Sequence, residues 1–98
     1  MEFAMKIPDS LRKKYLDRRA QDAESLAVSL DQGELTELAR IGHQLKGNAA
    51  TYGYETLAAL GHKMEHAVDT QSLPEGKECL FALRAWLQEQ TSQVGEDG

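Results

Sequence analysis

The chain has 98 residues, enough for one small domain with a single hydrophobic core. Its formal net charge of −5 argues against nucleic acid or an anionic membrane as the main partner. The single cysteine excludes an intrachain disulfide and a cysteine-based zinc cluster. No apolar run approaches the ~20 residues of a membrane span. These features together favour a cytoplasmic protein.

The first predicted helix runs from Pro8 to Leu30, after a flexible lead-in over residues 1–7. Gly33 follows this helix as a stop signal. Its apolar residues recur at helical spacing, at Leu11, Tyr15, Ala23, Leu26, Ala27 and Leu30. The helix also carries a basic cluster, which we expect to be mainly a solvated face. That cluster consists of Arg12, Lys13, Lys14, Arg18 and Arg19.

The second predicted helix runs from Glu34 to Tyr52 and the third from Tyr54 to Asp69, with Gly53 between them as a structural helix cap. One face of the second helix carries Leu35, Leu38, Gly42, Leu45, Ala49 and Tyr52. The third helix has an apolar stripe of Leu57, Leu60, Met64 and Val68. Each helix therefore has one face to bury.

The fourth predicted helix begins at a capping box, Ser72 to Glu75, and ends near Gln90. Its stripe is Leu80, Leu83, Trp86 and Leu87, with Cys79 beside it as a small core residue. Residues 91–98 are predicted to form a flexible acidic tail. Short connections imply antiparallel neighbours. The sequence thus predicts an all-α fold, an antiparallel up-down four-helix bundle over residues 8–90.

His43 lies on the second helix but far from its apolar stripe. At ~100° per residue, it falls about 140° from the centre of that stripe and points at solvent. The neighbouring residues are mostly small, where a surface helix normally carries long charged side chains. Gly47 within the helix costs ~1 kcal/mol relative to alanine, which suggests that open space matters there. We predict a docking surface around His43 that comprises Thr36, Ala39, Arg40, Gly47 and Ala50.

Lys46 follows His43 by three residues, a spacing at which its ammonium reaches a group on the imidazole ring. A neutral imidazole is a good nucleophile at physiological pH, and a nearby cation offsets the charge of an anionic group. This combination favours acceptance of a phosphoryl group, with His43 as acceptor and Lys46 as the phosphate-stabilising residue. Alone, either side chain is more simply a solvated surface residue.

The segment from His43 to Gly53, HQLKGNAATYG, resembles the signature of histidine phosphotransfer (HPt) domains. That signature is a histidine, any residue, an aliphatic residue, Lys-Gly, a small residue two positions further on, and a second glycine. The similarity extends from Ile7 to about Gln90. The resemblance implies that His43 is phosphorylated on Nε2 by a receiver-domain aspartyl phosphate. His43 then passes the group to the aspartate of another receiver.

The same resemblance implies a phosphoryl carrier rather than an enzyme, without an ATP site or kinase activity. Its partners would be receiver domains of response regulators or of a hybrid histidine kinase. It needs no cofactor of its own, since the receiver supplies Mg²⁺. Family members often carry a glutamine or glutamate that accepts a hydrogen bond from the histidine Nδ1–H, and Glu65 occupies that position. A carboxylate there would orient His43.

Two alternatives remain open. The first is a docking or scaffold module that binds a receiver but transfers nothing, although such a module has no need of a nucleophile. The second is a bundle that holds a metal, since His62 and His66 have a metal-ligand spacing. No third ligand accompanies them, so the sequence predicts no metal site. Because four apolar stripes can satisfy one another within one chain, we expect a monomer.

Overall fold

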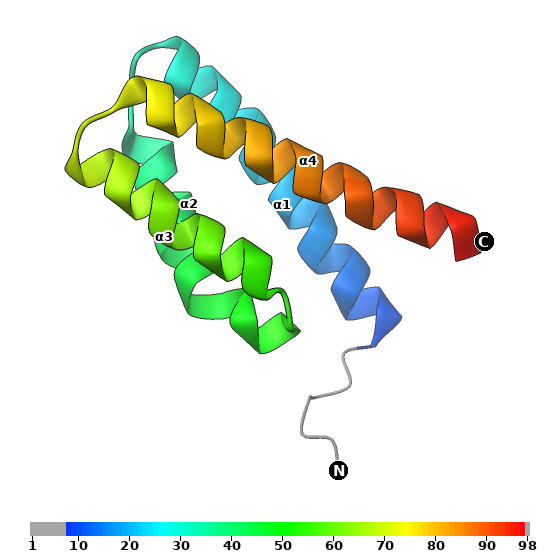
Figure 1. Cartoon of the computed structure of the whole chain (residues 1–98). Helices are drawn as coiled ribbons and strands as arrows, with labels where there is room; N and C mark the ends of the chain where they lie inside the picture. Colours follow the sequence, from blue (N-terminus) through cyan, green and yellow to red (C-terminus); the bar gives the residue numbers. More distant parts are fainter. Residues whose placement is uncertain (1–7, 98) are drawn as a thin grey trace.

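A computed structural model describes the backbone of residues 8–97 and the side chains of residues 8–91. This part of the chain contains four α-helices and a 3-10 turn (Figure 1). They are α1 (Asp9–Asp31), α2 (Thr36–Asn48), η1 (Ala50–Tyr52), α3 (Glu55–Asp69) and α4 (Leu73–Asp97). The predicted all-α fold is confirmed. The predicted lead-in, residues 1–7, lies outside the described residues.

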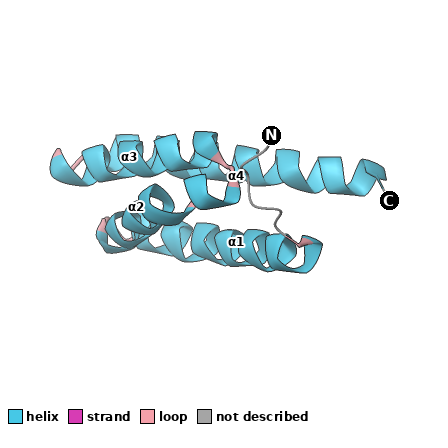
Figure 2. Ribbon diagram, turned by 90° about the horizontal axis from the view of Figure 1, so that it is seen from below, coloured by secondary structure: helices cyan, strands magenta, loops and turns pink. Residues whose placement is uncertain are grey.

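The helices form two layers, with α3 and α4 on one side and α2 and α1 on the other (Figure 2). The chain reverses direction at each connection in Figure 1, which is consistent with an up-down bundle. Among the described residues, α2 and α3 make the most extensive contact of any helix pair. The position of α2 in the bundle is therefore set mainly by α3.

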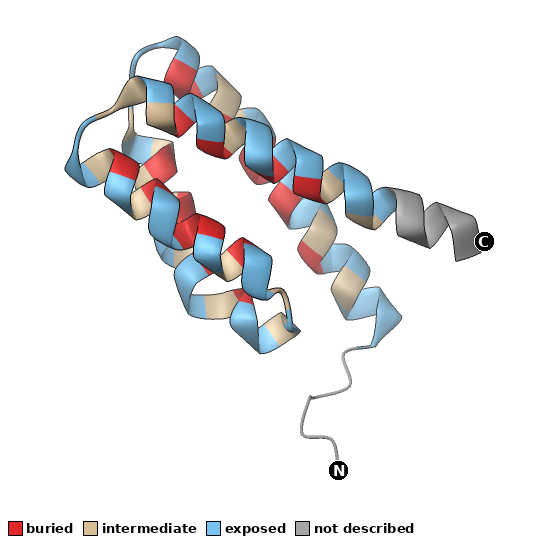
Figure 3. Cartoon of the chain, in the orientation of Figure 1, coloured by how far each residue is buried: buried red, intermediate tan, exposed pale blue. Residues whose placement is uncertain are grey.

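Buried residues occur on all four helices (Figure 3), and the buried apolar ones form one core cluster. The fully buried ones include predicted stripe residues of all four helices, namely Leu26, Leu38, Leu45, Leu57, Met64 and Leu83. Cys79 and Trp86 are also buried, as predicted. The prediction is wrong for Leu11, which is 45% exposed because it lies in the first turns of α1, near the open end of the bundle.

Two predicted helix ends are wrong. The second helix does not continue to Tyr52: α2 ends at Asn48, the chain tightens into η1, and Gly53 then adopts a left-handed conformation with φ of +83°. The fourth helix continues past Gln90 to Asp97. The polarity of residues 91–97 favoured a flexible tail, but a polar segment remains compatible with a helix that projects past its neighbours (Figure 1).

The predicted cap of the fourth helix is half formed. Ser72 Oγ accepts a hydrogen bond from the Glu75 backbone N–H at 3.2 Å, as a capping box requires. The Glu75 carboxylate does not return to the Ser72 backbone but pairs with His66 Nδ1 at 3.3 Å. This contact joins the end of α3 to the beginning of α4.

Candidate functional site

His43 projects from α2 into solvent, and its side chain is 80% exposed. Gly42, directly before it, and Leu45, two positions after it, are buried against α3. Because that face of α2 packs against the core, the face that carries His43 points to solvent. The predicted exposure of the imidazole is confirmed. The ring is therefore open to a second protein.

Glu65 of α3 lies beside His43 and Lys46 of α2. Its Oε1 lies 2.9 Å from Lys46 Nζ, and its Oε2 lies 3.7 Å from His43 Nδ1. The first distance is that of a charge-assisted hydrogen bond, and the second is longer than a hydrogen bond. The structure thus brings together the three residues that the sequence placed at the chemical centre. Lys46 of α2 thus pairs with Glu65 of α3.

The Lys46 ammonium, which donates a hydrogen bond to Glu65, lowers the pKa of that carboxyl below its ordinary value. Glu65 is therefore anionic at neutral pH. A negative charge facing Nδ1 favours the tautomer that carries its proton on Nδ1. The lone pair of a neutral His43 ring then resides on Nε2. This arrangement gives a nucleophile with a defined reactive atom.

The predicted docking surface runs along α2 and continues onto η1. Thr36, Gly47 and Ala50 are exposed, and Ala39 is half-buried. A Cβ added at Gly47 would meet nothing within 4 Å. The surface beside His43 therefore has open space where most helices carry a side chain.

The placement of Gly47 differs from the prediction in one respect. It lies in the last turn of α2, one residue before Asn48, rather than in the middle of a longer helix. Its backbone is nevertheless not left-handed, unlike that of Gly53. Gly47 thus has no capping role, and the open space around it remains its distinguishing feature.

Arg40, the charged member of the predicted docking surface, is directed toward α1. Its Nη2 lies 3.2 Å from Asp22 Oδ1 and 2.6 Å from Glu37 Oε1. Ser25 Oγ of α1 donates to the same Glu37 oxygen at 3.0 Å. Hydrogen bonds from Arg40 lower the pKa of Glu37, and those carboxylates in turn raise the pKa of Arg40. Arg40 therefore ties α2 to α1 one turn before His43.

The carboxylate at the centre of this network, Asp22, is 2% exposed and lies on the core face of α1. Arg19 Nε lies 2.9 Å from Asp22 Oδ2, and the Arg19 guanidinium covers the Tyr15 ring at 4.7 Å. The expectation of a solvated basic face is wrong for Arg19, which is 3% exposed. A buried carboxylate one turn away explains the difference, because a buried charge requires a partner.

Three tyrosines support the segment that follows His43. The Tyr15 and Tyr52 rings stack at 4.2 Å, and Tyr54 meets Trp86 edge-on at 4.9 Å. Tyr15 Oη also donates a hydrogen bond to Asn48 Oδ1 at 2.8 Å. The two contacts of Tyr15 hold the end of α2 and η1 against α1, and the Tyr54 contact joins the start of α3 to α4. Asn48 belongs to the signature segment, and only the structure assigns it this role.

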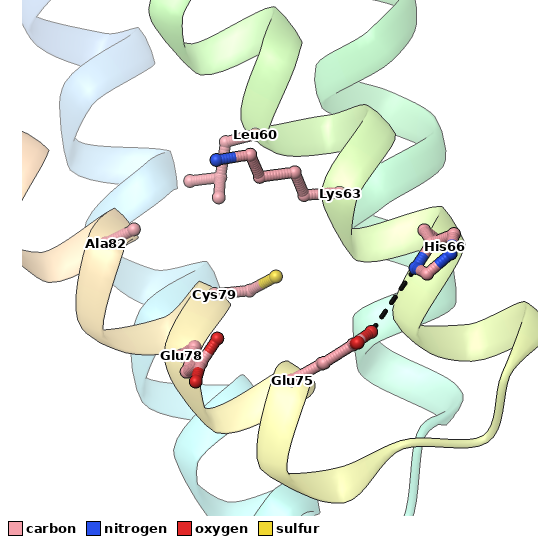
Figure 4. Close-up of a pocket in the computed structure, with 7 residues that line it drawn as sticks. All are labelled: Leu60, Lys63, His66, Glu75, Glu78, Cys79 and Ala82. Carbon is pink, nitrogen blue, oxygen red and sulfur yellow. Dashed lines mark hydrogen bonds and ion pairs between the residues drawn. The ribbon is translucent and has the colours of Figure 1, made fainter.

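The other two histidines lie on α3. His62 and His66 are exposed, and the described residues contain no group of three or more histidine, cysteine, aspartate or glutamate side chains able to hold a metal ion. A hollow of about 340 Å³ between α3 and α4 contains no predicted site residue (Figure 4). It is lined by Leu60, Lys63, His66, Glu75, Glu78, Cys79 and Ala82.

Sequence reasoning missed one close contact between α2 and α3. Gly61 of α3 is buried against Gly42 of α2. A glycine inside a helix costs ~1 kcal/mol relative to alanine. That cost at Gly61, within a clear helical pattern, was the available signal.

The sequence matches the family model of the Hpt domain over residues 10–93. Comparison with curated proteins and with solved structures gave no significant match. No helix in the described part of the chain has the length and apolar character needed to cross a membrane. The family match confirms the resemblance seen in the segment from His43 to Gly53. The chain belongs to the Hpt domain family, the histidine phosphotransfer modules of phosphorelays.

Proposed function

We propose that His43 accepts a phosphoryl group on Nε2 from the aspartyl phosphate of a receiver domain and passes it to a second receiver aspartate. The observation that carries this proposal is the contact of Glu65 with both His43 and Lys46, on an exposed face of α2. The receivers belong to response regulators or to a hybrid histidine kinase. The chain itself acts as a carrier, not as a kinase.

The transfer step conserves charge and protons. The Nε2 lone pair forms the N–P bond while the P–O bond to the aspartate breaks, and the electron pair leaves with the carboxylate. The proton on His43 Nδ1 stays in place, so the phosphorylated ring is cationic. The adjacent Glu65 carboxylate stabilises that cation, and transfer onward reverses the same steps.

Lys46 supplies positive charge for the transferred group. Its ammonium is held by Glu65, and a rotation of the flexible lysine side chain brings it toward oxygens on Nε2-bound phosphorus. Positive charge aimed at the transferring phosphoryl group is the main protein contribution in such reactions. The acidic residues and Mg²⁺ come from the receiver in this proposal.

The docking surface allows the receiver aspartate to approach His43. Thr36, Ala39, Gly47 and Ala50 leave room for a partner helix or loop, whereas Arg40 acts mainly by fixing α2 against α1. We also expect a cytoplasmic protein, and a monomer because the four helices bury their apolar stripes against one another.

The test uses a receiver domain from the source organism, phosphorylated with radioactive ATP by its own sensor kinase. Label is expected to move to the chain as an acid-labile, base-stable adduct. His43→Gln should accept none, and His62→Gln, which changes an exposed histidine on α3, should accept as much as the unchanged chain. Label on the His43→Gln variant would show that the assignment is wrong.

The same material distinguishes the docking alternative. A scaffold would bind a receiver equally well with His43→Ala and would accept no label from any receiver of the organism. A carrier would accept label from at least one receiver and return it to another. Profiling all receivers therefore separates the two functions and also names the partners.

A further inference from the structure

The backbones of α2 and α3 touch where Gly42 meets Gly61. A Cβ added at Gly61 would lie 2.7 Å from the Lys46 backbone nitrogen and 2.8 Å from the Gly42 carbonyl oxygen. A Cβ added at Gly42 would lie 2.8 Å from Met64 Cβ and 3.1 Å from the Gly61 carbonyl oxygen. Most of these neighbours are backbone atoms, which cannot rotate away. Only a residue without a side chain fits at either position.

This contact lies directly beside the proposed phosphotransfer site. Gly42 immediately precedes His43, and Gly61 precedes Glu65 by one helical turn. The Gly61 position faces the backbone of Lys46 itself. The separation of α2 and α3 at this point therefore sets the distance between the Glu65 carboxylate and the side chains of α2.

We propose that Gly42 and Gly61 are positioning residues, whose missing side chains set the α2–α3 distance at which Glu65 reaches Lys46 Nζ and His43 Nδ1 together. Packed helices are usually 8–10 Å apart, and a methyl group at this crossing would push them apart. A movement of α3 away from α2 would lengthen both the 2.9 Å contact of Glu65 with Lys46 and its 3.7 Å approach to His43. The importance of this geometry for transfer rests on the proposed function of His43.

The matched control is Gly76 of α4, which is buried against different residues. A Cβ added there would lie 3.1 Å from the ends of the Leu30 and Leu38 side chains. Gly76→Ala thus crowds the core without involving the α2–α3 crossing. A loss of stability in both Gly76→Ala and Gly61→Ala is therefore a packing effect. Only changes at Glu65 and His43 indicate the positioning role.

The experiment follows the Glu65 carboxyl by carbon NMR and the His43 ring nitrogens by nitrogen NMR, in the full chain. In Gly61→Ala and Gly42→Ala, the pKa of Glu65 should rise toward its ordinary value because its contact with Lys46 is lost. The His43 proton should shift from Nδ1 toward Nε2. Gly76→Ala should show neither change. A folded Gly61→Ala protein with both signals unchanged would overturn the proposal.

A second variant keeps the test decisive if the alanine variants do not fold. Glu65→Asp shortens the reach by about 1.5 Å, one C–C bond, without touching the glycine contact. It should produce the same shift of the His43 proton and slow phosphotransfer about ten-fold or more. An unchanged His43 tautomer in Glu65→Asp would overturn the positioning role. Because the NMR signals do not depend on phosphorylation, failure of the proposed function would appear separately, as a chain that accepts no label.

Discussion

Lys46 Nζ lies 2.9 Å from Glu65 Oε1, so the ammonium of α2 is paired with a carboxylate of α3. A phosphoryl group on His43 would compete with Glu65 for that ammonium. The carboxylate then retains its second role, next to His43 Nδ1. The pair thus links the residue proposed to bind phosphate with the residue proposed to orient the nucleophile.

Replacing Lys46 should therefore impair transfer without unfolding the bundle. In Lys46→Met the alkyl chain remains but the charge is lost, and we expect phosphoryl acceptance to slow about ten-fold or more. The fold should persist because the lysine side chain is 39% exposed. Transfer rates and circular dichroism check this, with Lys63→Met, an exposed lysine on α3, as the control. Equal rates in both variants would remove Lys46 from the site.

A bulky residue at Gly47 should block docking while the chain stays folded. The space around this glycine is open, so Gly47→Gln meets no steric obstacle in the folded chain and gains helix propensity. We expect transfer from the receiver to fall at least ten-fold, through weaker receiver binding. Ala85→Gln, at an exposed position of α4, is the matched control. Unimpaired transfer in Gly47→Gln would contradict the docking surface.

The buried carboxylate of Asp22 should be important for stability. Asp22→Ala leaves the Arg19 guanidinium buried without its partner, and we expect a loss of about 3–5 kcal/mol in the free energy of unfolding. Asp17→Ala, which removes an exposed ion pair with Lys13, should change it by about 0.5 kcal/mol or less. Chemical denaturation measures both. A loss at Asp22 no larger than that at Asp17 would contradict this account.

The acid side of the stability curve should depend on Glu37. Hydrogen bonds from Arg40 lower its pKa in the folded state, so the folded chain releases this proton more readily than the unfolded chain. The resulting stability is present above the ordinary glutamate pKa of about 4.3 and is lost as pH falls through the lowered folded value. Thermal unfolding between neutral and acid pH should therefore show a shallower acid decline in Glu37→Gln. The exposed Glu24→Gln variant should keep the original slope, and equal slopes in the two variants would refute the link.

The Cys79 thiol should react slowly in the folded chain. It is 5% exposed, and burial raises its pKa, so little thiolate is present at neutral pH. Iodoacetamide labelling followed by mass spectrometry should be slow in native protein and rapid in urea. Rapid labelling under native conditions would show that the α3–α4 interface opens readily.

Much of the fold was predictable because local pattern and burial agree in this chain. The helical stripes indicated which side chains enter the core, and Gly33 indicated where the first helix ends. The helix ends at Asn48 and Asp97 were not predictable in the same way. Apolar spacing continues smoothly through a 3-10 turn, and polar composition does not decide whether an exposed segment remains helical.

Local arithmetic along α2 was sufficient to place His43 on the exposed face and Lys46 beside it, since both depend only on helical geometry. The contacts between helices required the tertiary structure. The pairing of Lys46 with Glu65, the contact of Arg40 with Asp22, and the contact of Gly42 with Gly61 all join residues of different helices. Their distances depend on how closely two helices pack, and spacing along one helix contains no information about that separation.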